Sequence, residues 1–170
     1  MNFMRRIGTL ALLLFVFNVA FSQTGIPKAQ SMFIYNFSRL VEWPSSQKSG
    51  EFIIGVIGNS NVYSEIQNFT SGKKVGSQSI TVKQFKDFED ATASHILFVS
   101  YSKSNKLPDA LGGISNGTLI ITEKRNMLED GAVINFVIDS DKLKFEIDTQ
   151  NAQKMGLKVS SSLQNMAINQ

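Results

Sequence analysis

The chain has 170 residues, with 17 lysines and arginines, 14 aspartates and glutamates, one histidine and no cysteine. The lack of cysteine excludes disulfides, thiol catalysis, redox switching and cysteine-ligated metal sites. The net charge of +3 is small and the basic residues are not clustered, which argues against a nucleic-acid-binding surface.

A basic start, Met1 to Arg6, precedes an apolar run from Ile7 to Ala20, and this is the pattern of a secretory signal peptide. The small residues that follow the run predict cleavage before Gln23. Residues 1–22 are then a leader, and residues 23–170 are an exported, periplasmic domain. A membrane anchor is the alternative, but the run is shorter than the ~20 apolar residues that usually span a bilayer.

Loss of this leader changes the size and the charge of the chain. Removing 22 of 170 residues leaves 148, enough for one domain with a single core. Because Arg5 and Arg6 leave with it, the basic side chains fall from 17 to 15 against 14 acidic ones, a net charge of +1.

The first half of the domain alternates helical and extended patterns. Apolar residues at helical spacing predict a helix from Ile26 to Val41, which should stop at Trp43-Pro44 because proline disfavours helical geometry in the residue before it. The run Phe52 to Ile57 is nearly all apolar, as in a strand buried on both faces. A helix from Val62 to Phe69 and a weaker strand from Ser79 to Phe85 follow.

Two more apolar runs, Ile96 to Val99 and Thr118 to Ile121, flank a polar, helix-compatible stretch from Lys103 to Leu111. This alternation of buried strands and helices is typical of a parallel sheet with crossover helices.

The pattern changes after Gly131, where Ala132 to Ile138 and Leu143 to Ile147 are joined by four residues and predict an antiparallel hairpin. The second arm alternates apolar and charged residues, which leaves one face in water. A short helix is predicted from Thr149 to Met155, ended by Gly156, and a last helix from about Ser162 follows Leu157-Lys158-Val159. The sequence therefore predicts a single three-layer α/β domain with a mostly parallel sheet and crossover helices, ending in an antiparallel β-hairpin and short C-terminal helices.

Several segments, taken in chain order, resemble the YfiR family. Lys28 to Pro44 resembles the family's opening helix, in which a YNF run leads into WP. Residues 53–58 and 95–100 resemble its first and middle strands, and the strongest likeness lies at residues 131–137, 144–148 and 156–163. The resemblance covers nearly the whole predicted mature chain.

This resemblance implies a periplasmic regulator, tending to form a homodimer, that inhibits a membrane-bound signalling enzyme by contact with its periplasmic part. The enzyme is a diguanylate cyclase or a histidine kinase. No catalytic activity and no cofactor are implied. The family's best-known member responds to redox state through disulfides, which a chain without cysteine cannot do. A periplasmic receptor that holds a small molecule at the carboxyl ends of the parallel strands is the alternative function.

The resemblance also places the partner-binding surface on the C-terminal strand, the segment after it and the corner at Trp43. The candidate partner- or ligand-binding residues are Arg39, Glu42, Trp43, Lys144, Glu146, Leu157, Val159 and Leu163. Each has a structural alternative. Trp43 is typical of an anchor that packs a helix onto a sheet, and the charged residues fit exposed salt bridges or a solvated strand face.

Two other motifs favour structural roles. Gly55 to Asn61 runs from a strand to a helix as phosphate-binding loops do, but it lacks the dinucleotide-binding spacing, which favours a simple turn. His95, the single histidine, begins an apolar strand without a recognisable nucleophile elbow nearby, which predicts packing rather than catalysis. One histidine without cysteine also argues against a zinc site.

Overall fold

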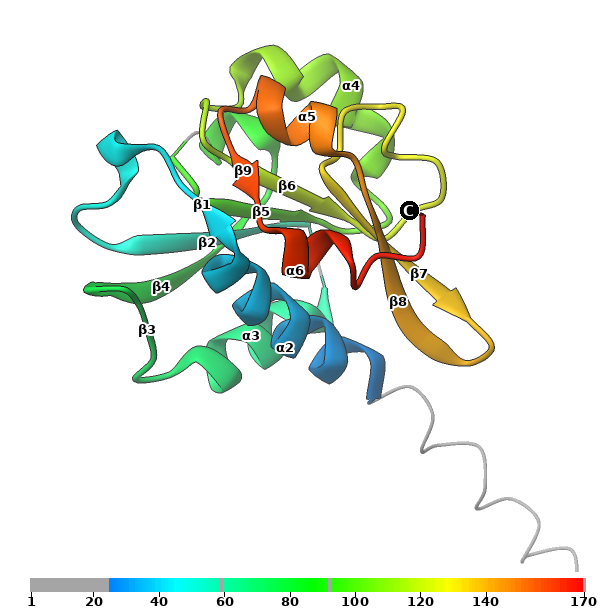
Figure 1. Ribbon diagram of the computed structural model, residues 1–170, viewed down its shortest axis with the longest axis horizontal. Coiled ribbons are helices and arrows are strands. Elements are labelled where there is room, and N and C mark those ends of the chain that lie inside the picture. Colours follow the sequence, from blue (N-terminus) through cyan, green and yellow to red (C-terminus); the bar gives the residue numbers. More distant parts are fainter. Residues whose placement is uncertain (1–24, 59, 92, 170) are drawn as a thin grey trace, which may run out of the picture.

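The computed structural model describes residues 25–58, 60–91 and 93–169 (Figure 1). The predicted leader, residues 1–22, lies outside the described residues. Within the described part, no helix is long and apolar enough to cross a membrane. The helices and strands are α2 (Gly25–Leu40), β1 (Val41–Glu42), β2 (Phe52–Ile57), α3 (Asn61–Thr70), β3 (Lys74–Val75), β4 (Gln78–Phe85), β5 (Ile96–Val99), α4 (Leu107–Ala110), β6 (Leu119–Thr122), β7 (Ile134–Asp139), β8 (Lys142–Ile147), α5 (Thr149–Lys154), β9 (Lys158–Val159) and α6 (Ser161–Gln164).

The central sheet has the strand order β3-β4-β2-β5-β6-β7-β8. The five inner strands β4, β2, β5, β6 and β7 are parallel to one another. The two edge strands, β3 and β8, run antiparallel to their neighbours. The chain passes from β2 to β4 on one side and later builds β5, β6 and β7 on the other. This is the doubly wound order of flavodoxin-like folds, whose ligands bind outside the carboxyl ends of the strands. The predicted mostly parallel α/β architecture is confirmed.

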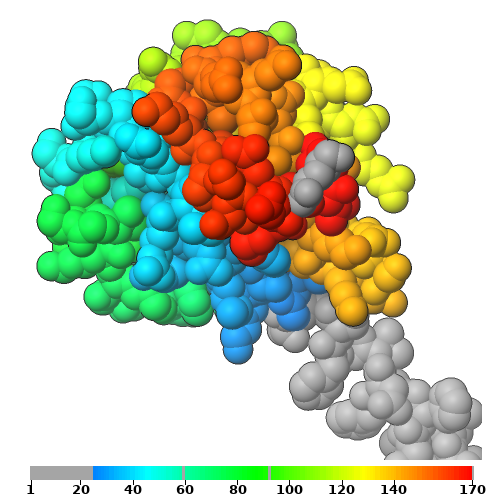
Figure 2. All heavy atoms as spheres, in the orientation of Figure 1, coloured from blue at the N-terminus to red at the C-terminus, as the bar shows by residue number. Residues whose placement is uncertain are grey.

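Apolar side chains cover both faces of this sheet, so the three predicted layers are present. One face packs under α2, α3 and α6, and Phe37 of α2 lies at its centre, 4.9 Å from the ring of Phe145 and 5.9 Å from that of Phe136. The second face packs under α4 and three short 3-10 turns, η2 (Phe88–Asp90), η3 (Ser104–Lys106) and η4 (Leu111–Gly113). Figure 2 shows the C-terminal residues (red) lying beside α2 (blue).

The first helix ends at Leu40, one residue before the predicted Val41 and three before the predicted stop at Trp43-Pro44. Val41 and Glu42 instead form β1, which pairs antiparallel with β9 across more than 100 residues of sequence. Trp43 follows as a buried residue, and its indole N–H donates to the Ser38 carbonyl at 3.2 Å. The pairing of distant segments, which helical periodicity does not report, therefore sets the end of this helix.

The helix-compatible stretch from Lys103 to Leu111 does not form one continuous helix. The segment is broken into η3, the four-residue α4 and η4. Pro108 sits in the first turn of α4, where proline is tolerated, and Gly112-Gly113 follows within four residues, where glycine costs helix stability.

The hairpin turns through Ser140 and Asp141, whose φ angles are 50° and 61°. A two-residue turn with two positive φ angles matches the twist of antiparallel strands. Asp139 pairs with Lys142 on either side of the turn, and Phe136 pairs with Phe145 further down. The predicted hairpin is confirmed, with its first strand beginning at Ile134 instead of Ala132.

His95 is buried and bonded at both ring nitrogens. The Ile53 amide donates to Nδ1 at 3.1 Å, so Nε2 carries the proton and donates to the Gln47 carbonyl at 2.9 Å. The ring stacks on Phe52 with centroids 4.5 Å apart. The predicted packing role of His95 is confirmed.

Gly58 closes the strand-to-helix turn after β2. Its φ is 89°, a conformation that favours glycine, and a side chain there would meet the Ser100 hydroxyl. Ser60 then caps α3 by accepting from the Val62 amide at 3.2 Å. These contacts fit the turn that the sequence favours over a phosphate-binding loop.

Candidate functional site

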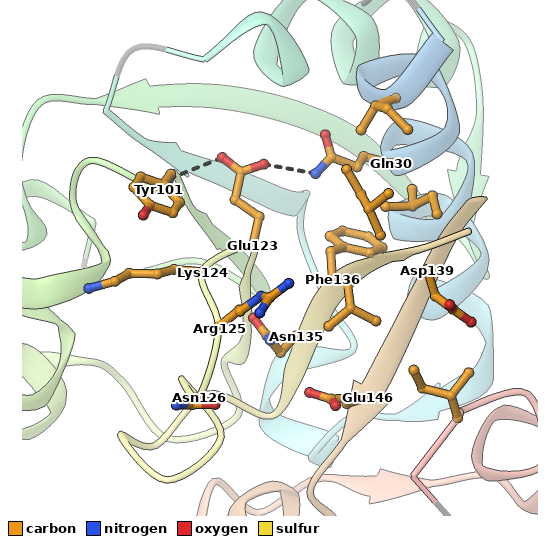
Figure 3. A pocket seen from close by; sticks show the side chains of 15 residues that line it. Gln30, Tyr101, Glu123, Lys124, Arg125, Asn126, Asn135, Phe136, Asp139 and Glu146 are labelled. Carbon is orange, nitrogen blue, oxygen red and sulfur yellow. Dashed lines mark hydrogen bonds between the residues drawn. The ribbon is translucent and has the colours of Figure 1, made fainter. Parts of the chain in front are cut away.

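A cleft of about 660 Å³ opens at the carboxyl ends of β5 and β6 and runs along β7 (Figure 3). Its position is one where parallel sheets commonly bind ligands, and its volume lies in the usual range for such sites. Its lining comes from six parts of the chain: Ile26 and Gln30, Tyr101, residues 123–126, residues 135–139, Leu143 and Glu146, and Ile168.

Glu123, the first residue after β6, ties three of these parts together. One carboxylate oxygen accepts from the side-chain amide of Gln30 at 2.9 Å, and the other accepts from the main-chain amide of Tyr101 at 3.0 Å (Figure 3). Gln30 is buried, whereas the Tyr101 ring is exposed. Glu123 therefore fixes the start of α2 to the ends of β5 and β6, which holds one wall of the cleft.

Asn135 lies in the opposite wall with its side chain fully buried. The Thr122 hydroxyl donates to its Oδ1 at 2.7 Å, but its Nδ2 has no hydrogen-bond partner among the described residues. The opposite orientation of the amide would leave Oδ1 unpaired instead, because a single hydroxyl lies beside it. A buried polar group without a partner costs about 1–3 kcal/mol, so a bound group that completes this amide would be favoured.

The charged groups around the cleft differ in their pairing. Lys124 donates to Asn105, away from the cleft, and Lys144 pairs with Asp139 at its rim. The hydrogen bond from Lys144, helped by the Ser140 hydroxyl, lowers the pKa of the Asp139 carboxyl. Arg125 and Glu146 form no ion pair within the part of the chain that the structure describes, so both charges are available to a bound partner.

Residues 27–168 match the YfiR/HmsC-like family, from the first turn of α2 to the segment after α6. The chain belongs to the YfiR/HmsC-like family. No curated protein matches it significantly. The family is periplasmic and regulatory rather than catalytic, so this chain is a regulator that resembles YfiR.

In this YfiR/HmsC-like domain, the predicted site residues fall into three groups that differ in burial. Lys144 and Glu146 lie on β8, opposite Val137 and Asn135. Both side chains are half-buried and Glu146 lines the cleft, so the strand face predicted to lie in water is only partly exposed.

The second group lies at the β1–β9 corner, where Arg39 and Glu42 are exposed and Val159 is half-buried against the core. Lys158, which was not predicted, is the fourth residue of this corner. Glu42 and Lys158 are opposite each other, with carboxylate and ammonium 3.8 Å apart and both side chains mostly exposed. Such a pair stabilises a fold by about 0–1 kcal/mol. Arg39 lies 5.9 Å from the Tyr35 ring.

Trp43, Leu157 and Leu163 form the buried group, with exposed fractions of 6 %, 1 % and 0 %. The Trp43 ring packs edge-on against Phe52, with centroids 5.2 Å apart, which is the anchoring role rather than a ligand platform. All three side chains belong to the core, and none offers a contact surface in this fold.

Sequence reasoning missed Glu123, Arg125, Asn135 and Gln30. One signal was present, since Glu123 to Asn126 directly follow an apolar run and polar residues there meet the carboxyl edge of a parallel sheet. Asn135 gave no such signal, because it interrupts a strand that is otherwise read as apolar core. Among the described residues, no group of three or more His, Asp or Glu side chains could hold a metal ion.

Proposed function

We propose that this chain holds a membrane-bound diguanylate cyclase or histidine kinase inactive by contact with the periplasmic part of that enzyme. The observation that carries the proposal is the family match over residues 27–168, since the family is regulatory and periplasmic. Export through cleavage of the predicted leader before Gln23 would deliver the domain to that compartment.

The fold offers two separate surfaces for this contact. The first, called the hairpin cleft, comprises Lys144 and Glu146 with the cleft that they border. The second is the β1–β9 corner. Helix α2 links them: Gln30 lies at the cleft, and Arg39 lies nine residues further on, which is about 14 Å along the helix axis. A small partner domain could therefore bind the hairpin cleft without contacting the β1–β9 corner, or the reverse.

The hairpin cleft is the better supported surface. It combines free charges at Arg125 and Glu146 with an incompletely bonded buried amide at Asn135. At the β1–β9 corner, by contrast, Glu42 already pairs with Lys158. Binding removes water from charged side chains on both partners. The free energy of binding is more favourable where such a charge gains a new partner than where an existing ion pair must first break.

Affinity capture from membranes tests the proposal and the choice of surface. Tagged wild-type chain should retain a membrane cyclase or kinase, and Glu146→Lys should retain at least tenfold less. Glu42→Lys tests the β1–β9 corner, and Glu89→Lys is the matched control, a charge reversal at an exposed residue outside both surfaces. If wild-type chain retains no signalling enzyme, the proposal is wrong; if Glu42→Lys alone loses it, the partner binds the β1–β9 corner.

The cleft also favours a second function, a receptor for a small molecule. Its volume and the unpartnered Asn135 amide fit a ligand with polar groups. A ligand at 100 times its dissociation constant stabilises a folded protein by about 2.7 kcal/mol. Thermal melting against a panel of small carboxylic acids, amines and nucleotides tests this. Stabilisation of the wild type that is lost in Asn135→Leu would support a receptor, and no stabilisation by any compound would argue against it.

A further inference from the structure

The edge of β7 that faces the cleft has no neighbouring strand beyond its first two residues. Strand β6 ends at Thr122, opposite Asn135, and within the described residues nothing pairs on that side with Phe136 to Asp139. All four of these residues line the cleft. Since successive side chains of a strand point to opposite faces, four consecutive residues share one cleft only if it runs along the strand edge. The main chain of β7 is therefore open to the cleft.

The hairpin geometry identifies which main-chain groups face this opening. A two-residue turn makes Asp139 and Lys142 a hydrogen-bonded pair, and bonded and non-bonded pairs alternate from there. Val137 then bonds to β8, whereas Ile138 directs its N–H and C=O toward the cleft. Phe145 agrees with this alternation, because its carbonyl points out of the hairpin and accepts from Ile168 N at 3.0 Å.

The other edge of the hairpin is covered by the chain itself at Phe145 and Ile147. Besides the bond from Ile168 to Phe145, the Asn169 side chain bonds both main-chain groups of Ile147, accepting from its N–H and donating to its carbonyl at 2.9 Å. Proteins usually cover or blunt exposed strand edges because such edges attract other strands. Here the C-terminal residues cover the outer edge at two positions, whereas no described strand pairs with the β7 edge over the cleft beyond Asn135.

The two sides of this open edge differ in chemistry. Ile138 and its cross-strand neighbour Leu143 lie on one face with Ile26 nearby, and Ile138 is 60 % exposed. On the other face, Asn135 and Glu146 are cross-strand neighbours, and Arg125 lines the same part of the cleft (Figure 3). Arg125 has no anionic partner within the described chain. An extended segment with apolar side chains on one face and an acidic side chain on the other would complement both.

We propose that the partner binds by strand addition, supplying an extended segment that pairs with the open edge of β7. Its main chain bonds the N–H and C=O of Ile138, its apolar side chains pack on Ile138 and Leu143, and a carboxylate reaches Arg125. Main-chain pairing supplies affinity in this mode, and alternate side-chain pockets supply specificity. The inference rests on the proposed function, because the segment belongs to the membrane enzyme. A compact small molecule would leave the Ile138 main chain unpaired.

Hydrogen exchange on the complex tests the pairing directly. The probe is the membrane enzyme captured by the wild-type chain, held in detergent. Strand addition should slow exchange of the Ile138 amide at least tenfold. Ile138→Asp should weaken binding at least tenfold, and the matched Met32→Asp should not, because Met32 is an apolar side chain of similar exposure, 45 %, outside the cleft. Circular dichroism establishes that both variants fold.

The outcomes separate this inference from the function on which it rests. Capture of the enzyme with unchanged exchange at Ile138, or normal binding by Ile138→Asp, overturns strand addition and leaves regulation by contact intact. Small-molecule stabilisation of the chain, with no protection of Ile138 by the enzyme, overturns it as well. If no enzyme is captured by the wild type, the proposed function fails, and strand addition fails with it.

Discussion

Replacing Phe145 by alanine should remove the centre of the core under α2. The side chain is 1 % exposed, and its ring meets Phe37 at 4.9 Å and Phe33 at 5.6 Å, both edge-on. Truncating a buried phenylalanine costs about 3–5 kcal/mol. Edge-to-face aromatic pairs add roughly 0.5–1.5 kcal/mol each beyond burial, which favours the upper half of that range.

For a domain of this size, each kcal/mol moves the melting temperature by about 2–4 °C, so Phe145→Ala should melt roughly 6–20 °C lower. Urea unfolding followed by circular dichroism gives the free energy of unfolding. The neighbouring Glu146→Lys is the control, and its side chain at the cleft should cost within about ±0.5 kcal/mol. A loss below about 1 kcal/mol for Phe145→Ala would refute the assignment of the β8 faces.

Four further predictions follow from individual contacts and from the sequence. Asp148 caps α5 by accepting from the Gln150 and Asn151 amides at 2.8 and 2.9 Å, so Asp148→Ala should cost about 1 kcal/mol in urea unfolding; an unchanged midpoint would contradict this. The hydrogen bond from Lys103 lowers the pKa of Asp87, so its contribution to stability is present above the unfolded pKa of about 4 and lost as the pH falls through the lowered value. The difference in stability between wild type and Asp87→Asn should therefore shrink as the pH falls below about 4, and a difference that does not change with pH would contradict it. Mass spectrometry of exported protein should find Gln23 at the N-terminus, and an intact Met1 would exclude cleavage. Light scattering should find a dimer, and a monomer at every accessible concentration would refute the predicted homodimer.

The elements that could be predicted are those encoded by local patterns. Residues 96–99 are all buried in β5, and a run of four apolar residues between polar stretches indicates such a strand without further information. The hairpin could also be predicted, because the alternation of its second strand and the short polar link are both patterns of neighbouring residues. The alternation of such strands with helical stretches also predicted the correct class of fold, a mostly parallel α/β sheet.

The rest depended on contacts between distant segments. The cleft joins Gln30, Tyr101, Glu123 and Asn135, and no spacing in the sequence reports that these four meet. The same holds for the pairing of β1 with β9, which ended the first helix early. Leu157 and Leu163 were predicted to contact a partner but are buried in the core. The family resemblance marked their segment as functional, but it did not indicate which of its side chains face the core.

The most direct test of the central claim is the activity of the membrane enzyme itself. The enzyme captured with the chain is reconstituted in vesicles with its periplasmic part outward, and its product formation is followed as purified wild-type chain is added. Regulation by contact predicts that activity falls and saturates near one chain per enzyme subunit, and that Glu146→Lys needs at least tenfold more protein for the same effect. Activity that stays constant at saturating folded wild-type chain would contradict the account.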